Sequence, residues 1–208
     1  MLLRTSRGFV WFLVAMCSAV CSAGDKEKKG ENYESAEYKV IQSEGNFEIR
    51  EYPDLLLAAT NMKLDSQDNG GGFMQLYGFI SGANSKKQKI AMTTPVFMES
   101  VEDGSGIQMG FIMPKDVVTQ GVPKPTGDQV KVQKRAGGRF AVVRFAGQMT
   151  EKSVERSEAQ LRSWMKKNGF VAASSAEGEG VETAVYDSPF VSGSKRRNEL
   201  IVRLKPAE

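Results

Sequence analysis

Apolar and polar positions follow one another along this chain in two similar series. In the first series, strand-like alternation covers residues 38–41, 47–52, 55–60, 90–99 and 107–113. Between the third and fourth of these strands, a glycine-rich turn at 69–72 leads into residues 73–83, whose apolar side chains recur at helical spacing. The first half therefore predicts a hairpin, a helix and a second hairpin.

The second series repeats this order. Alternation predicts strands over residues 129–134, 139–145, 182–186 and 199–204. The first two of them are expected to form a hairpin around Gly137. Residues 151–167 are predicted to be helical, with Thr150 as the N-cap and Asn168-Gly169 at the end. The apolar face of this helix is expected to contain Val154, Leu161, Trp164 and Met165.

A short proline-rich linker, with Pro114, Pro123 and Pro125, joins the two series. Neither series has enough strands to enclose a core alone, so we expect one domain over residues 37–206. The repeated element order indicates an internal duplication. The predicted fold is α+β, a distorted β-barrel of two pseudo-symmetric four-stranded halves with two external helices.

The N-terminal segment has the layout of a cleavable secretory signal over residues 1–23. Two arginines precede an apolar run at 9–20, and small residues follow up to Ala23. The run is shorter than the ~20 residues that a membrane-spanning helix needs. We therefore expect export into the secretory pathway, followed by a flexible polar leader at 24–36. An uncleaved anchor and a buried first helix are the alternatives.

Composition narrows the classes of function. The chain carries a formal charge of +3, and loss of the two arginines in residues 1–23 leaves +1. Such a near-neutral protein lacks the basic excess of a nucleic-acid binder. Both cysteines, Cys17 and Cys21, are lost with the signal, and the chain contains no histidine. These facts exclude Ser-His-Asp and Cys-His catalysis and the usual zinc sites, so no metal site is expected.

The predicted helix at 73–83 has an unusually apolar surface. Phe73, Tyr77 and Ile80 share one face because they stand four and three residues apart, and Met74 lies beside them. Two interpretations stay open. All four side chains belong to the core, or some of them form an exposed patch that binds another molecule.

Several short motifs, in order, resemble the SOUL/haem-binding protein family from about Tyr38 to Lys205. They are Phe47-Glu48-Ile49-Arg50, Gly82-Ala83-Asn84, Lys89-Ile90-Ala91-Met92-Thr93-Thr94-Pro95-Val96, Met109-Gly110-Phe111-Ile112-Met113-Pro114, Pro123-Lys124-Pro125, Tyr186-Asp187-Ser188-Pro189-Phe190 and Arg196-Arg197-Asn198-Glu199. The resemblance implies a distorted barrel of two similar halves with two helices, which agrees with the fold predicted from the order of the elements. It also implies that haem or another tetrapyrrole binds in a shallow groove beside the first helix.

By position, the resemblance places Phe73, Met74, Tyr77 and Ile80 along this groove, completed by Phe97 and Val185. Lys86, Arg196 and Arg197 are the implied cationic partners of the haem propionates. For the two arginines, the alternative is that they pair with acids and fix the last turn.

The chain departs from family members that ligate iron through histidine, and Gly78 stands where others carry a basic residue. Tyr77 or Met74 is a chemically allowed axial ligand, because both residue types ligate haem iron. We expect a monomeric, non-enzymatic binder of a small flat apolar ligand. The alternative function is a protein- or membrane-interaction module that uses the same apolar surface; an enzyme acting on tetrapyrroles is a third and weaker reading.

Overall fold

The computed structural model describes residues 33–63, 71–101, 106–173, 180–188 and 191–206. Its strands are β1 (Glu34–Ser35), β2 (Lys39–Glu44), β3 (Phe47–Tyr52), β4 (Leu55–Lys63), β5 (Thr93–Thr94), β6 (Val96–Ser100), β7 (Gly106–Ile112), β8 (Lys131–Arg135), β9 (Gly138–Ala146), β10 (Val181–Val185) and β11 (Arg197–Arg203). Its helices are α1 (Gly71–Ile80), α2 (Lys115–Gln120), α3 (Glu151–Lys167) and the short 3₁₀ helix η1 (Gly193–Lys195).

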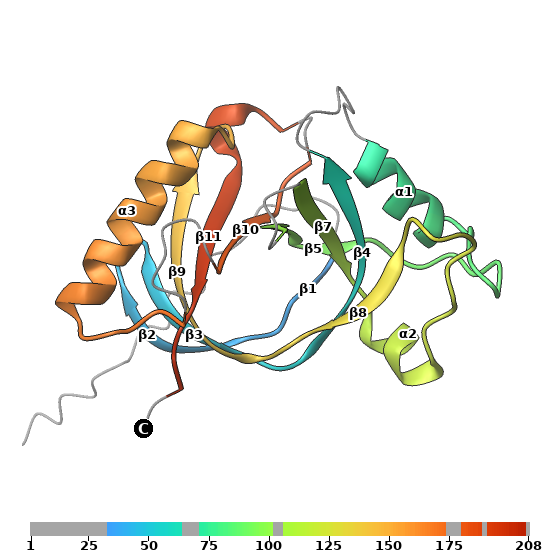
Figure 1. Cartoon of the computed structure of the whole chain (residues 1–208), viewed down its shortest axis with the longest axis horizontal. Helices are drawn as coiled ribbons and strands as arrows, with labels where there is room; N and C mark the ends of the chain where they lie inside the picture. Colours follow the sequence, from blue (N-terminus) through green and yellow to red (C-terminus); the bar gives the residue numbers. More distant parts are fainter. Residues whose placement is uncertain (1–32, 64–70, 102–105, 174–179, 189–190, 207–208) are drawn as a thin grey trace, which may run out of the picture. The chain divides into compact units, whose positions relative to one another are not determined.

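Nine strands form one antiparallel sheet in the order β2-β3-β9-β11-β10-β6-β7-β4-β8 (Figure 1). The α+β class is confirmed, with three α-helices in the described residues instead of the expected two. The closed barrel is wrong, because no ladder joins the edge strands β2 and β8 within the described part of the chain. All six residues of β2 are exposed, including the apolar Val40 and Ile41, and the partner of β2 in the described residues is β3.

The sheet consists of two four-stranded sets, which have exchanged one strand between the halves of the chain, and of β2, which is added at the edge beside β3. The strands β6, β7 and β4 are completed by β8 from the second half, whereas β10, β11 and β9 are completed by β3 from the first half. The expected hairpin between β8 and β9 is therefore wrong, since β8 pairs with β4 and β9 pairs with β3 and β11. Pairing of β6 with β10 joins the two sets at the middle of the sheet.

The exchange requires two chain crossings that lie against each other. One crossing runs from Tyr52 through Pro53 and Asp54 into β4, and the other runs through Gly137 into β9. The Gly137 backbone N–H donates to the Asp54 carboxylate at 2.8 Å. A Cβ atom at Gly137 would lie 2.5 Å from the Tyr52 carbonyl oxygen, so only glycine fits this crossing.

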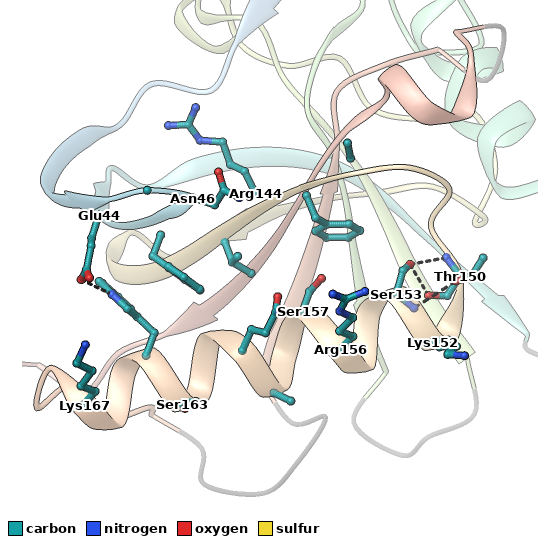
Figure 2. Close-up of a pocket in the computed structure, with 18 residues that line it drawn as sticks. Glu44, Asn46, Arg144, Thr150, Lys152, Ser153, Arg156, Ser157, Ser163 and Lys167 are labelled. Carbon is teal, nitrogen blue, oxygen red and sulfur yellow. Dashed lines mark hydrogen bonds between the residues drawn. The ribbon is translucent and has the colours of Figure 1, made fainter.

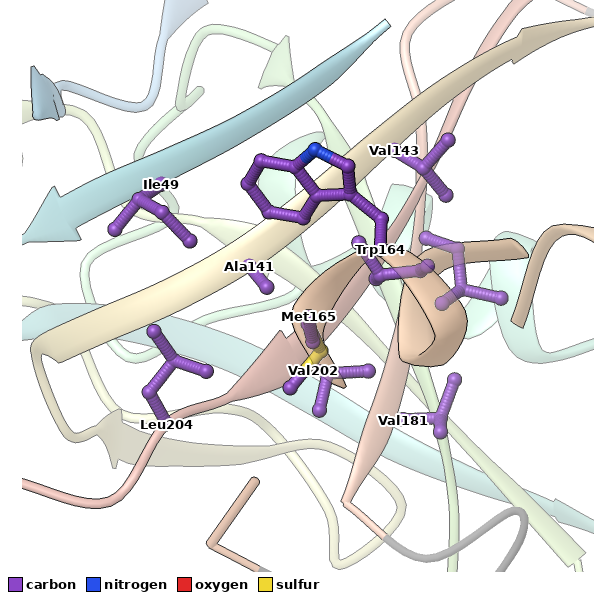
Figure 3. Close-up of a cluster of buried hydrophobic side chains, with 10 residues drawn as sticks. Ile49, Ala141, Val143, Trp164, Met165, Val181, Val202 and Leu204 are labelled. Atoms are coloured by element: carbon purple, nitrogen blue, oxygen red, sulfur yellow. The ribbon is translucent and has the colours of Figure 1, made fainter. Parts of the chain in front are cut away.

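Helix α3 covers β9 and β11 on one end of the sheet (Figure 1). Its predicted bounds and its Thr150 cap are confirmed, because the Thr150 hydroxyl accepts a hydrogen bond from the Ser153 N–H and the Ser153 hydroxyl accepts one from the Thr150 N–H. Its inward side chains pack into a core cluster, drawn in Figure 3, that contains Ile49, Ala141, Val143, Leu161, Trp164, Met165, Val181, Leu200, Val202 and Leu204.

Helix α1 lies against β4 and β7 at the other end of the sheet. Its core cluster contains Ala58, Leu76, Phe79, Ile80, Ile90, Phe111, Met113, Val117 and Val130. The short helix α2, which supplies Val117, occupies the segment that the sequence indicated as a plain linker. Pro114 stands immediately before its first residue, where the missing N–H of proline breaks no helical hydrogen bond.

Strand β1 falls inside the segment 24–36 that was expected to be a leader. It pairs in parallel with β5, and the following residue, Ala36, is buried. The Ser35 and Thr94 hydroxyls lie 2.9 Å apart, within hydrogen-bond distance. The expected signal at 1–23 lies outside the described residues and stays a prediction.

Candidate functional site

The outer face of α1 exposes three large apolar side chains in one row. Relative to a fully accessible residue, Phe73 is 37% exposed, Met74 60% and Tyr77 49%. The rings of Phe73 and Tyr77 are nearly parallel, with centroids 6.3 Å apart. Ile80, the fourth predicted groove residue, is buried in the core beneath the helix. The two sequence interpretations thus divide between residues: Ile80 belongs to the core, and the other three form what we call the α1 face.

Of the two remaining apolar residues predicted for the groove, Phe97 lies on the opposite face of the sheet from α1, whereas Val185 lies on the α1 side. Phe97 is buried on the face of the sheet that carries no helix, where its ring lies 4.5 Å from the Arg135 guanidinium carbon. Val185, on β10, is half-buried and pairs with Val96, which packs against the α1 cluster. Alternation along β6 explains the difference, because neighbouring residues of a strand point to opposite faces.

The three predicted cations also lie in separate places. The Lys86 ammonium donates to the Gly121 carbonyl at 2.8 Å, at the end of α2. Arg196 donates from Nε to the Val191 carbonyl at 2.9 Å. Arg197 donates to the Glu199 carboxylate at 2.9 Å and lies 4.1 Å above the Tyr186 ring. Pairing with an acid, the alternative reading, is thus confirmed for Arg197.

A buried charge network occupies the helix-free face of the sheet. Arg50 and Glu199, whose side chains are fully buried, form a two-pronged ion pair with N–O distances of 2.6 and 2.9 Å. Arg50 also donates to Glu48 at 2.6 Å and to the Tyr52 hydroxyl at 3.0 Å. The Tyr186 hydroxyl donates to Glu199 at 2.9 Å. Every charge here has a partner, so the network is suited to fixing the sheet rather than to acid–base chemistry.

The network perturbs the titration of its members. Burial alone would raise the pKa of Glu199, but the hydrogen bonds and charges of Arg50 and Arg197 outweigh it and hold that pKa below the ordinary 4.5. Burial raises the pKa of Tyr52 to about 12, against the opposing effect of Arg50. Glu199 therefore stays ionised and Tyr52 stays neutral around neutral pH.

Lowering the pH should remove the contribution of Glu199 to stability. Because its folded-state pKa is depressed, that contribution is complete above pH 4.5 and is lost as the pH falls through the depressed value. When the pH is lowered below 4.5, we expect the urea concentration at the unfolding midpoint of the wild type to decrease. The midpoint of Glu199→Gln should be lower than that of the wild type at pH 7 and should change less with pH. Urea unfolding curves between pH 3 and 7 measure this; equal pH slopes for the two proteins would contradict it.

A groove of about 1250 Å³ lies between α3 and the strands β2, β3 and β9 (Figure 2). Its apolar lining includes Phe47, Phe145 and Trp164. The Phe47 ring and the Trp164 indole are stacked 5.3 Å apart, with 7° between their planes. The Trp164 N–H donates to the Glu44 carboxylate at 2.7 Å, which satisfies both polar groups at one end of the groove. We call this cavity the α3 groove.

The charged residues that line the α3 groove are mostly cations. Lys152, Arg156 and Lys167 contribute from α3, all exposed. Arg144 also lines the cavity, but Figure 2 shows its side chain directed away from α3, and it pairs with Glu48 in the buried network. The sequence predicted an apolar face on α3 but not the groove beside this helix. The four-residue spacing of Lys152 and Arg156 was the available sign of a basic stripe.

A smaller cavity of about 200 Å³ lies on the helix-free face, lined by Glu99, Gln133, Arg135, Glu182 and Arg203 among others. The Arg135 guanidinium is buried beside the rings of Phe97 and Phe140 and donates to Glu182 at 2.8 Å. This lining is polar and charged, so the cavity fits water-sized polar molecules rather than a flat apolar ligand.

The described residues contain no group of three or more Asp, Glu, Cys or His side chains placed to hold a metal ion. Within the same ranges, the helices are all too short or too polar to span a bilayer.

Comparisons with known proteins agree with the architecture. The chain is 29% identical to human Heme-binding protein 2 over 164 residues, covering 75% of this chain and 77% of the relative. The mouse protein of the same name is 28% identical over 154 residues, covering 70% and 72%. A hydrolase structure from Listeria innocua shares the fold, with a TM-score of 0.56 at 13% identity over 79% of this chain and 94% of that one. The sequence model of the family described as SOUL heme-binding protein matches residues 33–203, and the chain belongs to this family.

Proposed function

We propose that this protein is a non-enzymatic binder of haem or a related tetrapyrrole, which it holds against the α1 face. The observation that carries the proposal is the row of exposed Phe73, Met74 and Tyr77 side chains in a member of a haem-binding family. Soluble proteins usually leave apolar side chains exposed singly, and a contiguous apolar patch often marks a binding surface.

The α1 face suits a flat ring held mainly by contact area. The two nearly parallel rings and the Met74 side chain offer an apolar surface about one helical turn long. The Tyr77 hydroxyl and the Met74 thioether are the groups there that can hold iron, since histidine is absent from the chain. When bound, haem would supply redox-active iron, and the protein residues would position the ring and cover one side of it.

The proposal extends to export. The expected secretory signal at 1–23 would deliver the protein to the secretory pathway or outside the cell, where it would carry or buffer a tetrapyrrole. The nearly neutral charge that remains after cleavage supports a small-molecule ligand over a nucleic acid.

Truncating the α1 face should weaken binding of hemin. We expect Met74→Ala/Tyr77→Ala to lose about 10- to 100-fold in the affinity of the α1 face, because removal of two apolar contacts costs about 1.5–3 kcal/mol. Absorption titration with hemin and with iron-free protoporphyrin measures this. The matched control is Val171→Ala, which removes an apolar side chain 57% exposed at another place and should leave affinity unchanged.

Tyr77→Phe separates ring contact from iron ligation. If the Tyr77 oxygen ligates iron, this variant loses affinity for hemin and keeps its affinity for protoporphyrin. No saturable spectral change with either porphyrin would reject tetrapyrrole binding, and would leave the α1 face as a surface for a protein or membrane partner.

A further inference from the structure

The α1 face and the α3 groove differ in charge. Helix α1 has no acidic residue in its first turn and no basic residue in its last turn. Lys86, the cation predicted to lie at its rim, is held by the Gly121 carbonyl at 2.8 Å. The α1 face therefore offers apolar contact but no helical cation for a carboxylate, whereas haem carries two carboxylates on one edge of its ring.

The α3 groove has the cations that the α1 face lacks. Lys152, Arg156 and Lys167 line it, and none of the three has an ion-pair partner among the described residues. The acid in this lining, Glu44, accepts a hydrogen bond from the Trp164 N–H. The acid Glu158 of α3 is paired with Arg162, outside the groove lining. The groove thus keeps an excess of positive charge in a protein that is nearly neutral as a whole.

The positions of these cations fit a dicarboxylate with a flat apolar body. Lys152 and Arg156 stand four residues apart on α3, a spacing that puts their Cβ atoms ~5–6 Å apart on the same face. The same groove is lined by Phe145 and by the stacked pair of Phe47 and Trp164. A ring lying over the aromatic side chains would bring two carboxylates at one edge within reach of both cations.

We propose that the α3 groove is a second tetrapyrrole-binding surface, and that it selects ring systems carrying free carboxylates. This inference rests on the proposed function and adds a site and a specificity to it. The α1 face binds the ring by apolar contact irrespective of its carboxylates, and the α3 groove binds through Lys152 and Arg156 as well as through its aromatic lining. Selectivity for the acid form arises because an ester cannot accept a charge-assisted hydrogen bond of the same strength.

The test compares protoporphyrin with its dimethyl ester, which differs only in having neutral side chains, using the full chain and following absorption and porphyrin fluorescence. We expect the wild type to bind the dicarboxylate about tenfold more tightly than the diester, with the difference shrinking as salt is raised. Lys152→Ala/Arg156→Ala should reduce this ratio to about one. Both side chains are exposed, so the variant should fold normally, which circular dichroism checks.

The matched control is Lys131→Ala/Lys166→Ala, which removes the same charge from exposed positions outside the groove lining and should keep the tenfold ratio. Tyr77→Ala weakens only the α1 face, so it should weaken the diester at least as much as the dicarboxylate and should not lower the ratio. A ratio near one in the wild type, or an unchanged ratio in Lys152→Ala/Arg156→Ala, would overturn the second site and leave the α1 face intact. Absence of saturable binding by either porphyrin would overturn the proposed function together with this inference.

Discussion

Arg50→Met should lower the free energy of unfolding by about 3–5 kcal/mol, because breaking one side of a fully buried ion pair leaves the other charge uncompensated. Arg50 makes two bonds to Glu199, one to Glu48 and one to Tyr52, and its guanidinium lies 4.1 Å above the Tyr38 ring. Methionine fills a similar volume without any of these bonds. Urea unfolding followed by circular dichroism at neutral pH measures the loss.

The exposed ion pair between Lys134 and Asp54 provides the comparison. Its side chains are 62% and 59% exposed, with the ammonium nitrogen 2.6 Å from the carboxylate. Lys134→Met should cost less than about 1 kcal/mol, as exposed pairs usually do. Equal decreases in the free energy of unfolding for the two variants would show that burial does not determine how much these ion pairs stabilise the protein. A decrease below about 1 kcal/mol for Arg50→Met would contradict the stabilising role of the buried network.

Gly137→Ala should destabilise the protein by about 3 kcal/mol, at the upper end of the cost of overpacking. The added methyl carbon would lie 2.5 Å from the Tyr52 carbonyl oxygen and 2.6 Å from the Pro53 carbonyl carbon, both backbone atoms that side-chain rotation cannot move. This steric clash can be relieved only if the two chain crossings move apart, which would break the hydrogen bond from the Gly137 N–H to the Asp54 carboxylate. The shift in thermal or urea midpoint measures the effect.

Gly78→Ala is the control for this substitution. Gly78 lies inside α1, and a Cβ atom there would meet nothing within 4 Å. The same chemical change should therefore stabilise the protein by about 0.5–1 kcal/mol through the higher helix propensity of alanine. Destabilisation by Gly78→Ala, or tolerance of Gly137→Ala, would contradict the packing described at these two positions.

Local patterns in the sequence predicted most elements but not how the strands pair. The bounds of α3 and its Thr150 cap followed from apolar spacing and a capping residue, because these depend on neighbours in the chain. The β8–β9 hairpin was a reasonable prediction from a Gly-Gly turn, yet β8 pairs with β4. Residues 131–135 and 55–59 meet only when both halves are folded, so no local pattern reports their pairing.

The candidate site was also predicted from the sequence only in part. The helical spacing of Phe73, Met74 and Tyr77 identified one apolar face, but it could not tell which positions the core takes, and Ile80 belongs to the core. Val96 and Phe97 are neighbours in β6 and face opposite sides of the sheet. An error of one position in the sequence prediction therefore moves a residue from one face of the sheet to the other. The α3 groove depends on how β2 and β3 lie beside α3, which the sequence does not encode locally.

An amide chemical-shift titration of the protein with protoporphyrin tests the central claim most directly, because it reports where the ring binds as well as whether it does. The account predicts saturable shifts in α1 around Met74 and Tyr77, accompanied by shifts along α3 around Arg156. Spectra that stay unchanged up to saturating porphyrin, or shifts confined to the helix-free face around Arg135 and Glu182, would contradict it.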